Sequence, residues 1–509
     1  MLPRARLADA AAVAAGAALS FAFAPFDLWP LALLAPAALF ALWQGAAPRR
    51  AAALGFLFGA GTFGAGTWWL YISIHDFGEA PLWLTLLLIV ALVAIMAAWQ
   101  ALLGYLAARL LSAAGALRWL AGLPALWLLV EWWRGWFLSG FPWLSLGYSQ
   151  TDSPLAALAP LGGVYLLSAV LALNAGALVA LWHGTARVRA LALVALVGPW
   201  AVALALRPVA WTQPEGAPVS VAVAQGAVPQ DQKWQLENRT PTRELYRGLT
   251  ARVLGTRLIV WPESAVPELA NDAQDFLKQI YAAGHEHGSD ILMGALRADG
   301  DDYYNSILAL GDTVAFYDKR HLVPFAEYFP VPAFVRRWLR LMSLPYSDFE
   351  RGRPGQPALA VGDLKVAATI CYEDAFGAEQ LARLRSANVL VNVTNDAWFG
   401  RSPARFQHFQ ISRMRALESG RYLVRAANDG VSAVVGPRGE VLARAAEYRP
   451  TVLQGTVRPM GGLTPYARAG NVPVVALGLA GVAAAMLAQW RRRRRDRGTD
   501  APPRVKLSS

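Results

Sequence analysis

The sequence predicts two joined parts: a multi-pass α-helical membrane domain with about eight spans, and an α/β domain outside the membrane. Three observations lead to this prediction. The chain is 55% hydrophobic and only 16% charged, which is too apolar for an ordinary soluble protein of this length. Eight apolar stretches approach or reach the length of a membrane helix. Between about residues 218 and 457, charged residues become frequent and short β-branched runs alternate with helical stretches.

The apolar stretches divide into seven that precede the α/β region and one that follows it. They cover residues 10–24, 31–43, 51–72, 82–110, 119–138, 155–182, 190–206 and 472–490. This order predicts a seven-helix membrane domain over 1–211 and a C-terminal transmembrane helix over 472–490. A cleaved signal peptide over 1–24 is the alternative, but six more apolar stretches follow it without a polar mature domain.

Basic residues indicate the orientation of these helices in the membrane. They occur at Arg4, Arg6, Arg49, Arg50, Arg109, Arg118, Arg187, Arg189 and Arg491 to Arg495, whereas loops 75–80 and 139–154 have no Lys or Arg. Because basic loops stay in the cytoplasm, we expect both termini and the tail 491–509 there. The domain 218–457 then lies outside, in the periplasm of a bacterium. The arginine run could suggest nucleic acid, but after an apolar span it is more typical of contact with anionic lipid.

Glu131 and Arg134 lie near the outer end of the fifth apolar stretch, in "LLVEWWRGWF". Ionisable residues in a span are costly and often functional. Their aromatic neighbours are typical of a membrane interface. A salt bridge between the two is favoured, and contact with a lipid headgroup is the alternative.

The region 218–457 contains the patterns of a single α/β domain. Apolar and β-branched runs predict strands at 219–228, 257–264, 290–296, 305–310, 366–374 and 388–396. Several are apolar throughout, as strands buried on both faces are. Helical patterns cover 273–288 and 404–421, and the Asp429-Gly430 and Gly439 turns predict hairpins within 427–445.

Three of the predicted strand ends carry reactive side chains. Glu263 follows "LIVWP", Lys319 lies in "AFYDKRHLVPF", and Cys371, the only cysteine of the chain, follows "VAATI". Ligands collect beyond the carboxyl ends of strands in open α/β sheets. A base, a cation and a nucleophile in one pocket suit acyl transfer. Singly, each residue has an ordinary structural explanation: a helix cap, a solvated charge and a small buried hydrophobe.

Other chemistries have less support in the sequence. There is no G-x-S-x-G motif, and the chain has only six His. His285 and His287 in "GHEHG" could suggest a metal, but no third ligand is evident. We therefore predict no metal site.

The segments "WPESAVP", "YDKRHLVPFAEYFP" and "ICYEDAFG" resemble the three Glu-Lys-Cys motifs of the nitrilase superfamily. Combined with seven preceding spans and one following span, they make the whole chain similar to the apolipoprotein N-acyltransferases of Gram-negative inner membranes. The resemblance implies a nitrilase-like αββα sandwich for 218–457. It also implies that Glu263 is the general base, Lys319 stabilises the oxyanion, Cys371 is the nucleophile and Glu327 is a second essential glutamate.

Four further positions match the family with weaker motif support: Tyr372 and Glu373 after the cysteine, Asn305 in "YYNSILAL", and Trp234 in "QGAVPQDQKW". One position departs from the family pattern, since Ala326 stands where Gly is expected. If that position needs a positive φ, alanine strains it and the placement of Glu327 is in doubt.

The resemblance also implies the reaction. Cys371 takes an acyl chain from a phospholipid, typically phosphatidylethanolamine, and passes it to the α-amino group of the diacylglyceryl-cysteine of an apolipoprotein. This is the last step of bacterial lipoprotein maturation and needs no metal or organic cofactor. One alternative is a membrane-anchored amidase or hydrolase of the same superfamily, in which water accepts the acyl group. Another is a transporter or lipid-binding scaffold with an inactive outer domain, against which the intact Glu-Lys-Cys set argues.

Overall fold

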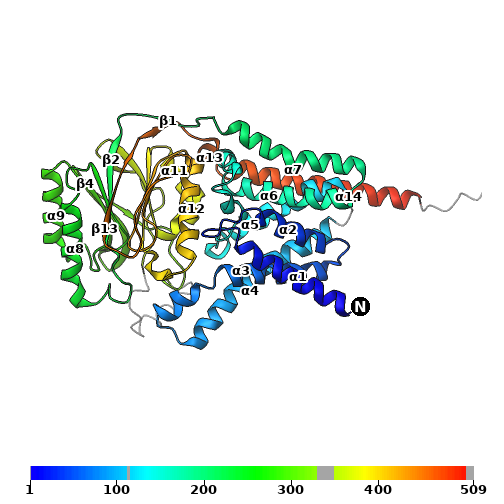
Figure 1. The fold of residues 1–509 in the computed structure, drawn as a ribbon, viewed down its shortest axis with the longest axis horizontal. Coiled ribbons are helices and arrows are strands. Elements are labelled where there is room, and N and C mark those ends of the chain that lie inside the picture. Colours follow the sequence, from blue (N-terminus) through cyan, green and yellow to red (C-terminus); the bar gives the residue numbers. More distant parts are fainter. Residues whose placement is uncertain (1, 112–114, 329–348, 500–509) are drawn as a thin grey trace, which may run out of the picture.

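The computed structural model describes residues 2–111, 115–328 and 349–499. A bundle of helices forms one end of the molecule, and two β-sheets with their covering helices form the other (Figure 1). The last ten residues of the basic tail and the end of the Lys319 motif, from residue 329, lie outside the described residues.

Each predicted apolar stretch contains a helix. These are α1 Leu2–Ser20, α2 Leu31–Leu42, α3 Pro48–Gly66, α4 Leu82–Leu110, α5 Leu123–Arg134, α6 Ala159–His183, α7 Ala186–Leu206 and α14 Val472–Thr499. Among the described residues, four helical segments are long and apolar enough to cross a membrane: Leu82–Leu110, Pro154–His183, Ala186–Leu206 and Val472–Arg491. Several apolar helices of membrane-spanning length are therefore confirmed. The number of eight spans stays a prediction, since α2, for example, has only 12 residues.

The α/β part contains two six-stranded sheets. The first has the order β13-β2-β3-β4-β5-β6, with β2 Val219–Gln225, β3 Leu258–Trp261, β4 Asp290–Asp299, β5 Asp302–Leu310, β6 Val314–Asp318 and β13 Thr451–Val457. The second has the order β12-β11-β10-β9-β8-β7, with β7 Leu359–Val361, β8 Leu364–Ile370, β9 Val389–Thr394, β10 Leu423–Ala427, β11 Ala433–Val435 and β12 Val441–Arg444. The predicted strands and hairpins are confirmed, because each overlaps one of these elements.

The two sheets pack face to face through a shared apolar core. Val223 and Val260 of the first sheet belong to the same buried cluster as Val366 and Val391 of the second. Strands β2, β3 and β4 pair in parallel, as do β8, β9 and β10. This explains why their sequences are apolar throughout, since both faces of each strand are covered.

Helices cover the outer face of each sheet, which completes an α-β-β-α order (Figure 1). Helices α8 Arg239–Ala251 and α9 Gln274–Glu286 cover the first sheet at the far end of the molecule. Helices α11 Gly377–Leu384 and α12 Ala404–Ser419 lie between the second sheet and the membrane helices. The second sheet therefore faces the membrane domain through α12.

Glu131 and Arg134 are buried together at the membrane-domain side of this junction, with 3.9 Å between a guanidinium nitrogen and a carboxylate oxygen. Arg134 also donates to the Ser145 hydroxyl at 3.1 Å, and Glu131 accepts the N–H of Leu146 at 2.9 Å. The favoured salt bridge is present, but the shorter contacts of both side chains are to residues of the loop 139–146. Because both side chains are buried, the structure does not favour the alternative of contact with a lipid headgroup.

Candidate active site

The carboxyl ends of β3 and β6 bring the predicted base and cation together. Both strands run in the same direction in the first sheet, because β3 is parallel to β4 and two antiparallel pairings lead from β4 to β6. Glu263 lies two residues after β3, and Lys319 directly follows β6. The N–H of Lys319 donates to the carbonyl of Asn305 in β5 at 2.8 Å. The pairing of the strands therefore positions Glu263, Asn305 and Lys319 at the same end of the sheet.

Lys319 lies between two carboxylates. Its ammonium is 2.9 Å from Glu327 Oε1 and 3.4 Å from Glu263 Oε1. The side-chain amide of Asn305 donates to the same two oxygens, at 2.9 Å and 2.8 Å respectively. All four residues are buried. Burial alone would lower the pKa of Lys319, but Glu327 and Glu263 outweigh it and hold the pKa above its ordinary value.

The doubt about Ala326 is resolved by the backbone. The residue with a positive φ is Phe325, at +64°, and Ala326 is not among the described residues in the left-handed region. Glu327 is held in place by Lys319, by Asn305, and by the N–H of Val323, which donates to Oε2 at 2.8 Å. The alanine therefore leaves this carboxylate well positioned.

Cys371 lies at a sharp turn where β8 ends. The strand stops at Ile370, and a short 3-10 turn spans Cys371–Ala375. Cys371 has a φ of +52°, a left-handed conformation that costs a side-chain-bearing residue about 1 kcal/mol or more. Its carbonyl accepts a hydrogen bond from Nε2 of the buried His408 at 3.1 Å. Cys371 as a whole residue is half-buried.

Glu263 and Lys319 both lie close enough to Cys371 to change the pKa of its thiol. Burial raises this pKa, the Glu263 carboxylate raises it further, and Lys319 lowers it, with the net value above the ordinary range. Lys319 alone would lower the pKa of the thiol, but burial and Glu263 outweigh it. Because the resting thiol is protonated, the reaction needs a base that removes the proton as sulfur attacks.

Glu373 ties the cysteine turn to the lysine loop. Its carboxylate accepts the N–H of Ile370 at 2.8 Å from one side. From the other side it accepts the N–H groups of Arg320 and His321, at 2.8 Å and 3.2 Å, and the hydroxyl of Tyr317. Glu373 therefore positions the backbone of two loops and is not part of the Lys319 cluster.

Tyr372 and Trp234, two other residues singled out from the sequence, also lie outside that cluster. The Tyr372 hydroxyl donates to the carbonyl of Gly140, in the membrane-domain loop, at 3.2 Å. Trp234 lies beside the buried Lys233, whose ammonium is 5.8 Å from the centre of the indole ring. Lys233 donates to the backbone carbonyl of Glu263 at 3.1 Å. From the sequence, Lys233 was not predicted to be a site residue. The rarity of lysine in this chain was a signal that could have indicated it.

A second buried network beneath the cysteine was also not predicted. Asp396 accepts from His408 Nδ1 at 2.8 Å and from the guanidinium of Arg425 at 2.8 Å. Burial would raise the pKa of Asp396, but Arg425 and His408 lower it to about 2. A permanently charged Asp396 therefore orients the imidazole that holds the Cys371 carbonyl.

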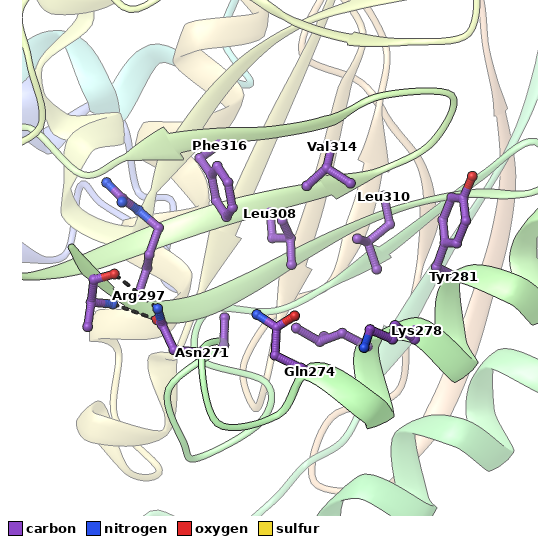
Figure 2. A pocket seen from close by; sticks show the side chains of 12 residues that line it. Asn271, Gln274, Lys278, Tyr281, Arg297, Leu308, Leu310, Val314 and Phe316 are labelled. Carbon is purple, nitrogen blue, oxygen red and sulfur yellow. Dashed lines mark hydrogen bonds between the residues drawn. The ribbon is translucent and has the colours of Figure 1, made fainter. Parts of the chain in front are cut away.

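A separate pocket of about 320 Å³ lies on the far side of the domain, between α9 and strands β5 and β6 (Figure 2). Tyr281, Leu310 and Phe316 line it together with Arg297, which pairs with Asp318. Its described lining contains no thiol and no carboxylate. The pocket therefore does not include Glu263, Lys319 or Cys371.

Comparisons with known proteins agree with this division into two parts. Residues 15–177 match the family model described as apolipoprotein N-acyltransferase N-terminal domain, and residues 220–466 match that of carbon-nitrogen hydrolase. The α/β part with the cysteine turn is thus a carbon-nitrogen hydrolase domain. A crystal structure of a CN-hydrolase superfamily protein from Xanthomonas campestris is 18% identical, with a TM-score of 0.36, and covers 48% of this chain and 91% of that chain.

Two relatives match nearly the full length. A protein of Methylococcus capsulatus named apolipoprotein N-acyltransferase is 42% identical over 488 residues, which cover 94% of this chain and 96% of the relative. A protein of Azotobacter vinelandii with the same name is 44% identical over 502 residues, which cover 96% of each. The chain belongs to the apolipoprotein N-acyltransferase family.

Proposed function

We propose that this protein transfers an acyl chain from a phospholipid to the α-amino group of the N-terminal diacylglyceryl-cysteine of apolipoproteins, through a thioester on Cys371. Family membership supports lipoprotein N-acylation, since relatives of almost the same length carry that name. The observation that carries the chemistry is the position of Lys319 between Glu263 and Glu327, close to a cysteine with a strained backbone.

In the first half-reaction, Glu263 takes the thiol proton while the sulfur of Cys371 attacks the acyl carbonyl of the phospholipid. The ammonium of Lys319 stabilises the oxyanion that develops on the carbonyl oxygen. When the carbon–oxygen ester bond breaks, the protonated Glu263 returns its proton to the leaving oxygen. The products are a lysophospholipid and a thioester on Cys371, and Glu263 is again a carboxylate.

In the second half-reaction, the α-amine of the lipoprotein attacks the thioester. Glu263 takes a proton from the amine, Lys319 again stabilises the oxyanion, and the carbon–sulfur bond breaks. The proton on Glu263 passes to the leaving sulfur, which restores the thiol. The product is an amide-linked acyl chain on the lipoprotein. One carboxylate thus serves as base and acid in both halves.

The membrane placement of this site is also part of the proposal. We infer eight spans in a bacterial inner membrane, a periplasmic domain over 218–457, and cytoplasmic termini, because the basic loops share one side. Helix α1 begins, and α14 ends, at the end of the bundle farthest from the sheets, which supports termini on one side (Figure 1). This placement brings the site to the outer bilayer surface, where phosphatidylethanolamine would be the acyl donor.

A membrane-anchored hydrolase or amidase is the second candidate, favoured by the match to the carbon-nitrogen hydrolase model. It would use the same three residues, with water in place of the amine. The two candidates differ in the fate of the acyl-enzyme when no amine is present. A transferase keeps the thioester until an acceptor arrives, whereas a hydrolase discharges it.

The test is to incubate the purified full chain with labelled phospholipid and no acceptor. We expect an acyl label on the peptide around "ATICYEDAF" that neutral hydroxylamine removes, since the chain has no other thiol. A diacylated lipopeptide with a free α-amine should discharge the label, and its N-acetylated counterpart, the matched control, should not. Cys371→Ser should acylate poorly, because a hydroxyl is far less acidic than a thiol. Full activity in Cys371→Ala, or rapid discharge to water alone, would contradict the proposal.

A further inference from the structure

Lysine is rare in this protein, and two of the lysine side chains that the structure describes are buried. Only five of its 47 Lys and Arg residues are lysines. Lys233 and Lys319 are each 1% exposed, whereas Lys278 and Lys365 are exposed. An ammonium is compact and can lose its proton when buried, which a guanidinium does not do. In a chain that otherwise uses arginine, the two lysines that are buried among the described residues both lie at the candidate active site.

The two lysines differ in their partners. Lys319 contacts two carboxylates, whereas Lys233 has no carboxylate oxygen within 4.0 Å among the residues that the structure describes. The ammonium of Lys233 donates to the main-chain carbonyl of Glu263 at 3.1 Å. Burial lowers its pKa to about 8, against the attraction of Glu263 and Cys371. These two reacting groups are therefore its electrostatic neighbours.

The charge of the site explains what such a cation can do. Glu263 and Glu327 are two buried carboxylates, and the single ammonium of Lys319 leaves one negative charge without compensation. Reaction keeps this net charge but relocates it, since the proton moves from Cys371 to Glu263 and the negative charge moves to sulfur. Uncompensated charge in a buried site is costly. A protonated Lys233 makes the site neutral.

We propose that Lys233 is a second active-site cation that anchors the main chain of Glu263 and offsets the negative charge of the carboxylates and of the Cys371 sulfur. Lys233 is a positioning residue, because it acts through Glu263 and through the charge of the site. Its contribution to acyl transfer rests on the proposed function. Its effect on the thiol does not, because that effect is present without any substrate.

The experiment measures alkylation of Cys371 by iodoacetamide in the purified full chain, across pH 6.5 to 10. The thiolate is the species that reacts, and Cys371 is the only cysteine, so the rate reports on this thiol alone. The variants are Lys233→Met, which removes the charge and the donor, and Lys233→Gln, which keeps a neutral N–H donor. Lys278→Met, the same substitution at an exposed lysine on α9, is the control.

At pH 7 we expect Lys233→Met to alkylate at least about tenfold more slowly than the unmodified protein, because loss of a nearby cation raises a thiol pKa by about one unit or more. Lys233→Gln should be similarly slow, and Lys278→Met should behave as the unmodified protein. The difference should shrink towards pH 9.5. Above pH 8 the native Lys233 loses its own proton, so both proteins then lack the charge.

Three results would overturn the proposal: a normal rate for Lys233→Met at pH 7, a rate ratio that is the same at every pH, or full recovery in Lys233→Gln. The last two would mean that Lys233 only anchors a carbonyl. If the methionine variant does not fold, the glutamine variant carries the same comparison.

The same proteins are then assayed for acyl-enzyme formation from labelled phospholipid. We expect the two Lys233 variants to be slowed at least about tenfold and Lys278→Met to be unaffected. Acylation of Lys233→Met at the native rate would refute the inference and leave the proposed function intact. Absence of acylation in the unmodified protein, together with Lys233-dependent alkylation, would refute the proposed function and leave the role of Lys233 at the thiol standing.

Discussion

The positions of single residues at this site depend on how the buried charges are paired. Lys319 satisfies two carboxylates with one ammonium, and Asn305 donates to the same two oxygens. The two donors offset part of the repulsion between Glu263 and Glu327. The geometry suits a compact point charge, because a planar guanidinium needs more room and forms two parallel hydrogen bonds.

Replacement of Lys319 therefore has a specific expected outcome. Lys319→Met should slow lysophospholipid release by about 10² to 10³, the usual cost of an absent oxyanion donor. Lys319→Arg should be nearly as slow, although it keeps the charge. The measurement is the burst of lysophospholipid in a single turnover, with Lys365→Arg, at an exposed lysine, as the matched control. Near-normal turnover of Lys319→Arg would show that only positive charge is required.

At the scale of elements, α12 connects the Cys371 turn to the membrane domain. One part of the helix supports the cysteine turn, since His408 holds the Cys371 carbonyl at 3.1 Å. Other parts contact the membrane domain, where Gln407 accepts from the Trp143 indole at 2.6 Å and Glu418 accepts the N–H of Val164 at 2.8 Å. The helix thus contacts both the membrane domain and the strained turn.

The role of α12 predicts different effects for two substitutions of His408. The side-chain amide of Gln reaches about as far as Nε2 and can still donate to the Cys371 carbonyl, whereas that of Asn is too short. We expect His408→Asn to lower kcat about tenfold or more with little change in KM, since a lost bond to a strained carbonyl costs on the order of 1–2 kcal/mol. His408→Gln should retain most activity. Equal activity of the two variants would indicate that the bond does not position the nucleophile.

At the scale of the whole molecule, an exposed ion pair and a buried carboxylate of α12 join the two parts. Arg413 of α12 binds Asp152 of the membrane domain, whose side chain is 53% exposed. Glu418, which is 2% exposed, pairs with Arg415 at 3.0 Å while it accepts the N–H of Val164. The exposed pair is screened by water, whereas the buried carboxylate is not.

Neutralising each carboxylate should therefore affect stability unequally. Glu418→Gln leaves the Arg415 charge buried and should destabilise the protein by about 3 kcal/mol or more. Asp152→Asn, the matched change at the exposed pair, should cost at most about 1 kcal/mol. Thermal unfolding of the purified protein in detergent provides the comparison. A midpoint lowered as much by Asp152→Asn as by Glu418→Gln would refute this account of the junction.

The orientation of the molecule in the membrane is testable with single cysteines. The two variants carry a single cysteine in place of Gln213 or of Thr499, in a Cys371→Ala background. The two cysteines should react differently with an impermeant maleimide on cells whose outer membrane alone is permeable. We expect labelling at position 213 and none at 499, because the basic loops lie on the side of the termini. The reverse pattern would place the catalytic domain in the cytoplasm.

The sequence by itself determined the features that depend on local pattern. Apolar stretches predicted where helices lie, and β-branched runs predicted the central strands, because both signals follow from residues close together in the chain. The reactive residues at the strand ends could be predicted for a related reason. Strands β3 and β6 run in the same direction in one sheet, so Glu263 and Lys319 lie at the same end of that sheet.

Only the tertiary structure decided which polar groups hold these residues. His408 is 37 residues from Cys371, Lys233 is 30 residues from Glu263, and Tyr372 is 232 residues from Gly140. A buried polar group must find a partner, but periodicity does not say which one, because the choice depends on packing between distant segments. The pKa of the Cys371 thiol was decided in the same way, since burial and Glu263 outweigh the lysine that the sequence placed beside it.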